Sequence, residues 1–150
     1  MEKMIKTLTE LEVEAACFVA ELSPQEGGAT LVTLSGDLGA GKTAFTKAVA
    51  RVLGVEETIT SPTFVLEKIY QLSPKYGSTK PIFKRLVHID AYRLEVGSDL
   101  APLGFDELMQ DAGNLILLEW PEKVLDALPT PTVRLSLSIL PDDSRMITYG

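Results

Sequence analysis

Apolar residues recur at helical spacing near the N-terminus and then form short blocks separated by turn residues. Residues 10–22 carry apolar side chains three or four positions apart, which predicts an amphipathic helix with Thr9 and Glu12 as its capping box. Aliphatic residues and threonines over 30–35 predict a strand. A second helix is predicted over 42–53, because its apolar positions share one helical face.

The rest of the chain predicts more strands than helices. Strand character is found over residues 64–70, 82–90, 115–118, 133–139 and 146–149, and the last two runs form a hairpin. Residues 98–111 predict a broken helix, because Pro102 and Gly104 lie inside it. Strands therefore alternate with helices early and pair as a hairpin late. This order predicts one α/β domain over residues 1–150, with a mixed sheet flanked by helices and a C-terminal hairpin.

The composition excludes several classes of protein. Lys and Arg number 14 against 21 Asp and Glu, a net charge of −7, and the cations are scattered, which argues against direct binding to a nucleic-acid backbone. The single cysteine, Cys17, excludes an intrachain disulfide. The longest purely apolar run, residues 15–20, is far shorter than the ~20 residues of a membrane-spanning helix, and the N-terminus has no secretory segment. We therefore expect a cytoplasmic protein without a membrane partner.

One stretch has the pattern of a phosphate-binding loop, which makes the predicted domain P-loop NTPase-like. Residues 36–43 match G-x-x-x-x-G-K-[ST], between a predicted strand and a predicted helix. Glycines let backbone N–H groups point into one hollow, and the following helix directs its positive end there. Lys42 supplies a cation for the β- and γ-phosphates, and the Thr43 hydroxyl is placed to bind Mg²⁺. The expected nucleotide-binding residues are Gly36, Asp37, Leu38, Gly39, Ala40, Gly41, Lys42, Thr43 and Ala44.

Two carboxylates follow strand-like runs further along the chain. Asp90 comes directly after residues 86–89, and Glu119 comes directly after residues 115–118. Ligands of open α/β sheets bind at the carboxyl ends of the strands, so both side chains are candidates for a magnesium site or for the attacking water. The alternative for Asp90 is a structural ion pair with Arg93, and each acid is otherwise a solvated group at a strand exit.

Three further features admit two interpretations each. Residues 61–63, Ser-Pro-Thr, are either a segment that senses the γ-phosphate, with Thr63 at the nucleotide, or a plain loop whose path the proline fixes. His88 is interpreted as a packed neutral histidine rather than a catalytic one. Trp120 either closes an edge of the core or presents an aromatic ring to a partner.

Missing signatures narrow the class of nucleotide-binding protein. The guanine signature [NT]-K-x-D, the GTPase D-x-x-G and the transporter L-S-G-G-Q are all absent. An ATPase, a small-molecule kinase and a nucleotide-gated binding module remain as alternatives on the same loop. Phosphate release without an acceptor separates the ATPase from the kinase, and a non-hydrolysable ATP analogue separates it from the module.

Four motifs together carry a family resemblance. Residues 36–43, Ser61-Pro62-Thr63-Phe64, residues 88–94 (His-Ile-Asp-Ala-Tyr-Arg-Leu) and residues 118–121 (Leu-Glu-Trp-Pro) occur in this order along essentially the whole chain. This combination resembles the bacterial TsaE (YjeE) family, small ATPases of tRNA threonylcarbamoyladenosine (t6A) synthesis. Ala91 departs from the family pattern, which usually has a larger residue there.

The resemblance implies a site and partners. It implies ATP or ADP with Mg²⁺ on a mixed sheet, Thr43 and Glu119 as magnesium ligands, and Asp90 beside Lys42 as residues needed for hydrolysis. It also suggests that the adenine lies near Glu10. The implied partners are the threonylcarbamoyl-transferase subunit (TsaD-like) and its dimerisation partner (TsaB-like), with tRNA contacted only indirectly. Hydrolysis then supports repeated cycles of modification at adenosine 37 of tRNA.

Overall fold

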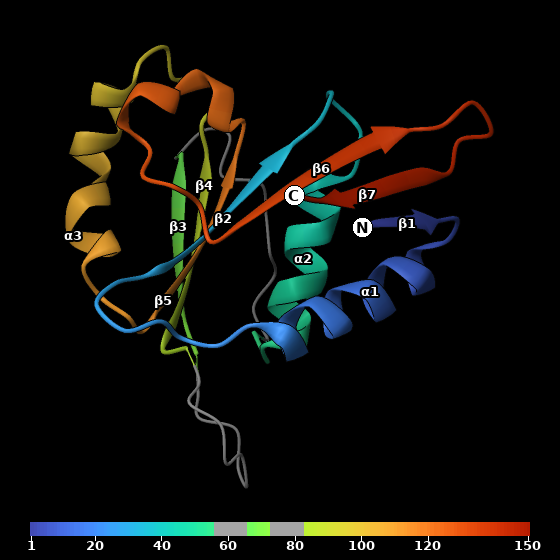
Figure 1. The fold of residues 1–150 in the computed structure, drawn as a ribbon, viewed down its shortest axis with the longest axis horizontal. Coiled ribbons are helices and arrows are strands. Elements are labelled where there is room, and N and C mark those ends of the chain that lie inside the picture. Colours follow the sequence, from blue (N-terminus) through green and yellow to red (C-terminus); the bar gives the residue numbers. More distant parts are fainter. Residues whose placement is uncertain (56–65, 73–82) are drawn as a thin grey trace, which may run out of the picture.

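The computed structural model describes residues 1–55, 66–72 and 83–150, and these residues form a seven-stranded sheet with helices on both faces (Figure 1). The order of the strands across the sheet is β1-β7-β6-β2-β5-β4-β3. Their bounds are β1 (Glu2–Ile5), β2 (Thr30–Ser35), β3 (Glu67–Gln71), β4 (Arg85–Asp90), β5 (Asn114–Glu119), β6 (Val133–Ile139) and β7 (Arg145–Tyr149).

The sheet is mixed, as the sequence predicts. Strand β5 lies between β2 and β4 and is parallel to both, and β6 is parallel to β2. Strands β3, β7 and β1 are antiparallel to their neighbours, and β6 and β7 form the expected C-terminal hairpin. The parallel centre directs several strand ends to one edge of the sheet, where a ligand site can form.

Helices cover the two faces of the sheet unequally. One face carries α1 (Leu8–Glu21) and α2 (Lys42–Val52), and the other carries α3 (Phe105–Met109) (Figure 1). The short 3₁₀ helices are η1 (Gly97–Leu103), η2 (Pro121–Lys123) and η3 (Leu125–Ala127). None of the helices in the described residues is both long enough and apolar enough to span a membrane.

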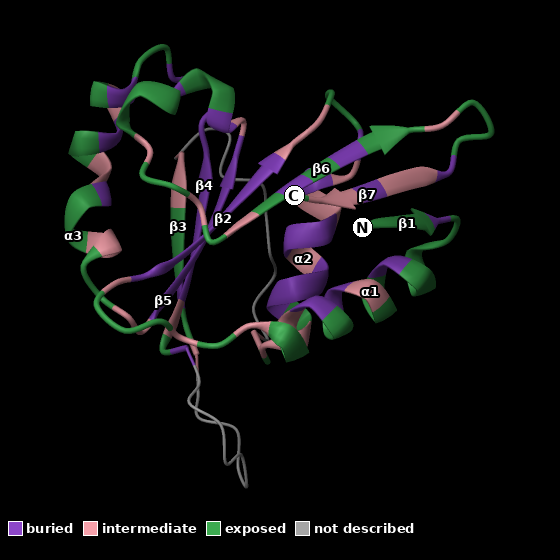
Figure 2. Cartoon of the chain, viewed as in Figure 1, coloured by how far each residue is buried: buried purple, intermediate pink, exposed green. Residues whose placement is uncertain are grey.

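Each face of the central strands has its own apolar core. Phe18 of α1 and Phe45 of α2 pack on one face against strand residues such as Leu117. Phe105 of α3 packs on the other face with residues such as Ile116. Alternate residues of β5 therefore belong to opposite cores, and the strand is buried throughout (Figure 2). This double coverage holds the carboxyl edge of the central strands in a fixed position.

The start of α1 differs from the sequence prediction. Thr7 is the N-cap, and its Oγ1 accepts a hydrogen bond of 3.1 Å from the Glu10 backbone N–H. The capping box predicted for Thr9 and Glu12 is wrong. The sequence contains the same Thr-x-x-Glu spacing twice in this stretch, and the chain uses the earlier copy.

Strand β1 is the element that sequence patterning missed. Its first three residues are exposed and only Ile5 is buried, so no alternation of apolar and polar residues marks it. It forms at the sheet edge by pairing with β7, with Met4 opposite Met146. The predicted break within residues 98–111 is confirmed, because Gly104 has a φ of 72° and separates η1 from α3.

Candidate nucleotide-binding site

The phosphate-binding motif has the strand–loop–helix context that it requires. The loop leaves β2 after Ser35 and enters α2 at Lys42, and Gly41 forms the N-cap with a φ of 107°. Gly36 has a φ of 146°, and a Cβ on it would overlap the carbonyl oxygen of Leu137. Glycine at both positions therefore follows from backbone conformation and, at Gly36, from close packing against β6.

Lys42 is held inside this loop. Its side chain is buried, and Nζ donates to the carbonyl oxygens of Gly36 and, at 3.1 Å, of Asp37. Nζ also lies 3.9 Å from the ring centroid of Trp120, a cation–π contact. Burial lowers the pKa of Lys42, and nearby carboxylates, Glu119 foremost, act in the opposite direction. The Lys42 ammonium group is therefore bound by carbonyl oxygens of the loop, and the oxygens of a phosphate would compete with these carbonyls for it.

Thr43 and Glu119 lie together, as the sequence predicts. The Thr43 hydroxyl is 3.2 Å from Oε1 and 3.3 Å from Oε2 of Glu119 and donates to the carboxylate. Glu119 is only 2% exposed, and its Oε2 also lies 2.5 Å from Nε2 of His88. His88 is packed in the interior, as interpreted from the sequence, but its contact with Glu119 was missed. His88 and Asp90 are two positions apart in one strand, and this spacing places them on the same face of the sheet.

Asp90 lies at the same edge of the sheet as Glu119. Its Oδ1 accepts a hydrogen bond of 3.0 Å from the Tyr92 backbone N–H. A cavity of about 300 Å³ opens between the loop, the start of α2 and the strand ends. Its lining consists of Leu38, Gly39, Gly41, Lys42, Thr43, Ala44, Asp90, Tyr92 and Trp120. The four polar residues that the sequence selects for chemistry, Lys42, Thr43, Asp90 and Glu119, thus gather at one place.

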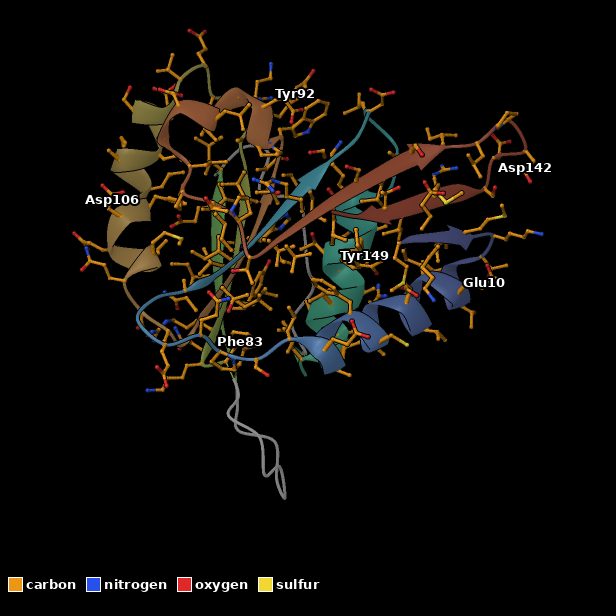
Figure 3. All side chains as sticks on the ribbon, viewed as in Figure 1. Glu10, Phe83, Tyr92, Asp106, Asp142 and Tyr149 are labelled. Atoms are coloured by element: carbon orange, nitrogen blue, oxygen red, sulfur yellow. The ribbon has the colours of Figure 1, made fainter. Side chains whose placement is uncertain are left out.

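Two aromatic residues border this cavity. The rings of Tyr92 and Trp120 lie 5.0 Å apart at an angle of 54°, and Tyr92 is 44% exposed. Figure 3 labels Tyr92. Trp120 has a φ of 60°, a conformation that costs a non-glycine residue about 1–2 kcal/mol. Its ring packs partly against the core beside α3 and also reaches Lys42. The packing of Trp120 therefore agrees with its interpretation as a residue that closes a core edge, and the ring also borders the cavity. Presentation of the ring to a partner stays a prediction.

Glu10 lies at the N-terminal end of α1 (Figure 3), where its Oε2 accepts a hydrogen bond of 2.5 Å from the Lys6 backbone N–H. A second cavity, of about 350 Å³, lies between this end of the helix and the other side of the phosphate loop. Its lining consists of Ile5, Lys6, Thr7, Leu8, Leu11, Gly39, Ala40, Gly41, Ala44, Leu137, Asp143 and Arg145. Thr63, the remaining candidate, lies outside the described residues together with Ser61 and Pro62.

The described residues contain no group of three or more His, Cys, Asp or Glu side chains arranged to hold a metal ion. Within this part of the chain, Thr43 and Glu119 offer one hydroxyl and one carboxylate to a cation. In proteins, Mg²⁺ usually keeps several waters and binds through one or two protein carboxylates plus phosphate oxygens.

The sheet order, the helices on both faces and the loop between β2 and α2 define an α/β protein with a P-loop-like fold. The crystal structure of Bacillus subtilis YdiB has the same fold, with a TM-score of 0.74 and 29% identity, over 99% of this chain and 83% of that chain. The family described as threonylcarbamoyl adenosine biosynthesis protein TsaE matches residues 5–147.

Curated relatives agree with this match. The tRNA threonylcarbamoyladenosine biosynthesis protein TsaE of Treponema pallidum is 40% identical over 121 residues, which are 81% of this chain and 82% of the relative. The protein of the same name from Bacillus subtilis is 37% identical over 119 residues, 79% of this chain and 68% of the relative. The chain belongs to the TsaE family, which confirms the resemblance drawn from the four motifs, and the family is involved in t6A biosynthesis.

Proposed function

We propose that this chain is a magnesium-dependent ATPase that supports t6A modification of tRNA. One observation carries the proposal: Lys42, Thr43, Asp90 and Glu119 meet at the carboxyl edge of the parallel strands, beside a phosphate-type loop. Membership of the TsaE family links the chain to t6A biosynthesis. The lack of guanine signatures in the sequence favours ATP over GTP.

The loop residues Gly36 to Ala44 would hold the phosphates of ATP or ADP. Phosphate oxygens would displace the carbonyl oxygens of Gly36 and Asp37 as partners of the Lys42 ammonium group. Charge-assisted contacts to phosphate are stronger than those to neutral carbonyls, so this exchange favours nucleotide binding. The start of α2 adds its backbone N–H groups and positive end.

Mg²⁺ suits the donors at this edge, because Thr43 and Glu119 offer a hydroxyl and a carboxylate in contact with each other. When bound, the ion would neutralise charge that develops on the transferred phosphoryl group. Asp90 would orient the attacking water or accept its proton, since its carboxylate lies in the same cavity and Tyr92 fixes its direction. Lys42 would stabilise the same charge from the loop side.

The adenine base would bind beside the start of α1. The second cavity adjoins the phosphate loop and is lined by Lys6, Thr7 and Leu8, which precede Glu10. This cavity supports an adenine site in the expected region near Glu10. It gives less support to a contact from Glu10 itself, because the Glu10 carboxylate accepts a hydrogen bond from the Lys6 backbone N–H. Thr63 remains a proposed contact to the γ-phosphate end.

The partners proposed are the TsaD-like transferase subunit and its TsaB-like dimerisation partner. A net charge of −7 suits an ATPase that reaches tRNA through a partner rather than by holding RNA directly. A cytoplasmic location is part of the same proposal, because tRNA modification takes place there.

Steady-state phosphate release tests the proposal. The wild-type chain is measured with Mg²⁺ and ATP alone, with the two transferase subunits, and with Lys42→Ala as the matched control. We expect release without any small-molecule acceptor, an increase when the subunits are added, and loss in Lys42→Ala. ADP formation that requires an acceptor, with the phosphoryl group on that acceptor and no free phosphate released, would indicate a kinase. Full support of modification by a non-hydrolysable analogue would indicate a nucleotide-gated module.

A further inference from the structure

His88 is a fully buried imidazole in contact with the proposed magnesium ligand Glu119. It lies on β4 with 0% exposure, and its Nε2 is 2.5 Å from Glu119 Oε2. Its other ring nitrogen, Nδ1, is buried and has no hydrogen-bond partner within the described part of the chain. One ring nitrogen of His88 therefore contacts a buried carboxylate, and the other makes no hydrogen bond among the described residues. Apolar packing alone does not account for such a contact, so the His88–Glu119 pair needs an explanation.

Strand register explains how the two side chains meet. Asp90 is paired with Glu119 across β4 and β5, and His88 is paired with Leu117. Leu117 belongs to the core beneath α1 and α2, so His88, Asp90 and Glu119 project to that same face by alternation. The His88–Glu119 contact is therefore the diagonal of two adjacent cross-strand pairs. It lies directly below the edge where Thr43 reaches the carboxylate from α2.

The surroundings also select a proton position on the ring. A carboxylate accepts hydrogen bonds, so the short contact places the proton on Nε2 of His88, which donates to Glu119. A proton on Nδ1 would leave a buried N–H without an acceptor in the part of the chain that the structure describes, which is unfavourable.

We infer that His88 is a positioning residue that fixes the Glu119 carboxylate for the cation. The inference rests on the proposed function, because it gives Glu119 the role of a magnesium ligand. A glutamate side chain has several rotatable bonds, so it binds a cation with a defined geometry only if one rotamer is held in place. His88 binds Oε2 from below, and Thr43 lies 3.2 Å from Oε1. Partners of this kind typically account for ~10–100-fold in metal affinity when they are removed.

Paired substitutions separate positioning from simple packing. His88→Leu removes the donor and keeps an apolar side chain, whereas His88→Gln keeps an N–H donor near the original Nε2. Leu86→Val, in the same strand and core, is the matched control for loss of core stability. The measurements are the Mg²⁺ dissociation constant in the presence of ADP, the ADP dissociation constant without Mg²⁺, and the thermal unfolding midpoint.

We expect His88→Leu to weaken magnesium binding ~10–100-fold, with metal-free ADP binding unchanged. His88→Gln should restore most of this loss, and Leu86→Val should keep wild-type magnesium affinity. Unchanged magnesium affinity in His88→Leu, or no recovery in His88→Gln, would overturn the inference alone. Failure of the wild-type chain to bind Mg²⁺ with ADP would overturn the proposed function and the inference together.

A spectroscopic readout needs no activity. His88 is the only histidine in the chain, so its ring nitrogens are identified without assignment by mutation. Nitrogen-15 NMR should show a protonated Nε2 and a bare Nδ1, and the Nε2 proton signal should move when Mg²⁺ is added to the ADP complex. A protonated Nδ1 with bare Nε2, or a ring signal indifferent to Mg²⁺, would contradict the positioning role.

Discussion

Asp90 and Glu119 are directly paired across the parallel strands β4 and β5, each at the last residue of its strand. Both are buried, at 5% and 2% exposure, yet they differ in their hydrogen-bond partners. Asp90 accepts from the Tyr92 backbone N–H, whereas Glu119 contacts the Thr43 hydroxyl. Two acids at equivalent strand positions thus have different contacts, which agrees with the proposal that Asp90 acts on water and Glu119 on the cation.

Lys42→Ala should weaken binding of ATP and ADP at least about tenfold, because a buried cation in the loop is lost. Isothermal titration with ATP, ADP and GTP measures this. Adenine nucleotides should bind the wild-type chain at least as well as GTP does, and a clear GTP preference would contradict the ATPase proposal.

Glu119→Gln should reduce magnesium affinity at least about tenfold and leave metal-free ADP binding nearly unchanged. The reason is that the substitution replaces the charged carboxylate beside the Thr43 hydroxyl with a neutral amide, a weaker ligand for Mg²⁺, while keeping the side-chain size. Titration of Mg²⁺ into the ADP complex measures the effect. Wild-type magnesium affinity in this variant would exclude Glu119 as a ligand.

Nucleotide binding should change the emission of Trp120, the only tryptophan in the chain. Phosphates would draw the Lys42 ammonium group away from its position 3.9 Å from the indole ring centroid. Intrinsic fluorescence during an ATP titration measures this, with Lys42→Ala as the control that lacks the contact beforehand. Emission that stays constant while calorimetry reports binding would mean that Lys42 does not leave the ring.

Gly36→Ala should destabilise the fold more than Gly54→Ala does. Both glycines have positive φ, at 146° and 89°, but only a Cβ on Gly36 meets another backbone, at Leu137. Strain alone costs about 1–2 kcal/mol, and the overlap with β6 adds to it. Chemical denaturation measures both free energies of unfolding. Equal losses would show that the loop moves away from β6 without cost.

Much of the fold could be predicted because its signals are local. Residues 115–118 are a continuous apolar run, and β5 is a strand buried on both faces. Gly104 breaks the chain between η1 and α3 by its positive φ, as its residue type suggests. Strand β1 had no such signal, because it forms only when β7 offers a paired edge.

The sequence predicted which residues belong to the site, including the two acids at strand ends, but it did not predict all of their contacts. Thr43 and Glu119 are far apart in the sequence, and topology alone brings both to one edge. The contact of His88 with Glu119 depends on the register between β4 and β5, which sequence spacing does not specify. The cavity beside Thr7 likewise depends on how α1 meets the phosphate loop, a tertiary relationship with no local pattern.

We propose that ATP hydrolysis by this chain supports repeated rounds of t6A modification. Its most direct test is multiple-turnover modification of tRNA by the transferase subunits, with either the wild-type chain or Asp90→Asn. Asp90→Asn should still bind ATP with Mg²⁺ but hydrolyse it about 10²–10⁴-fold more slowly, the typical contribution of a positioned acid or base. We expect modification then to stop after about one round per transferase. Sustained turnover with Asp90→Asn at wild-type rate, while its hydrolysis is lost, would show that hydrolysis by this chain is not needed for repeated rounds.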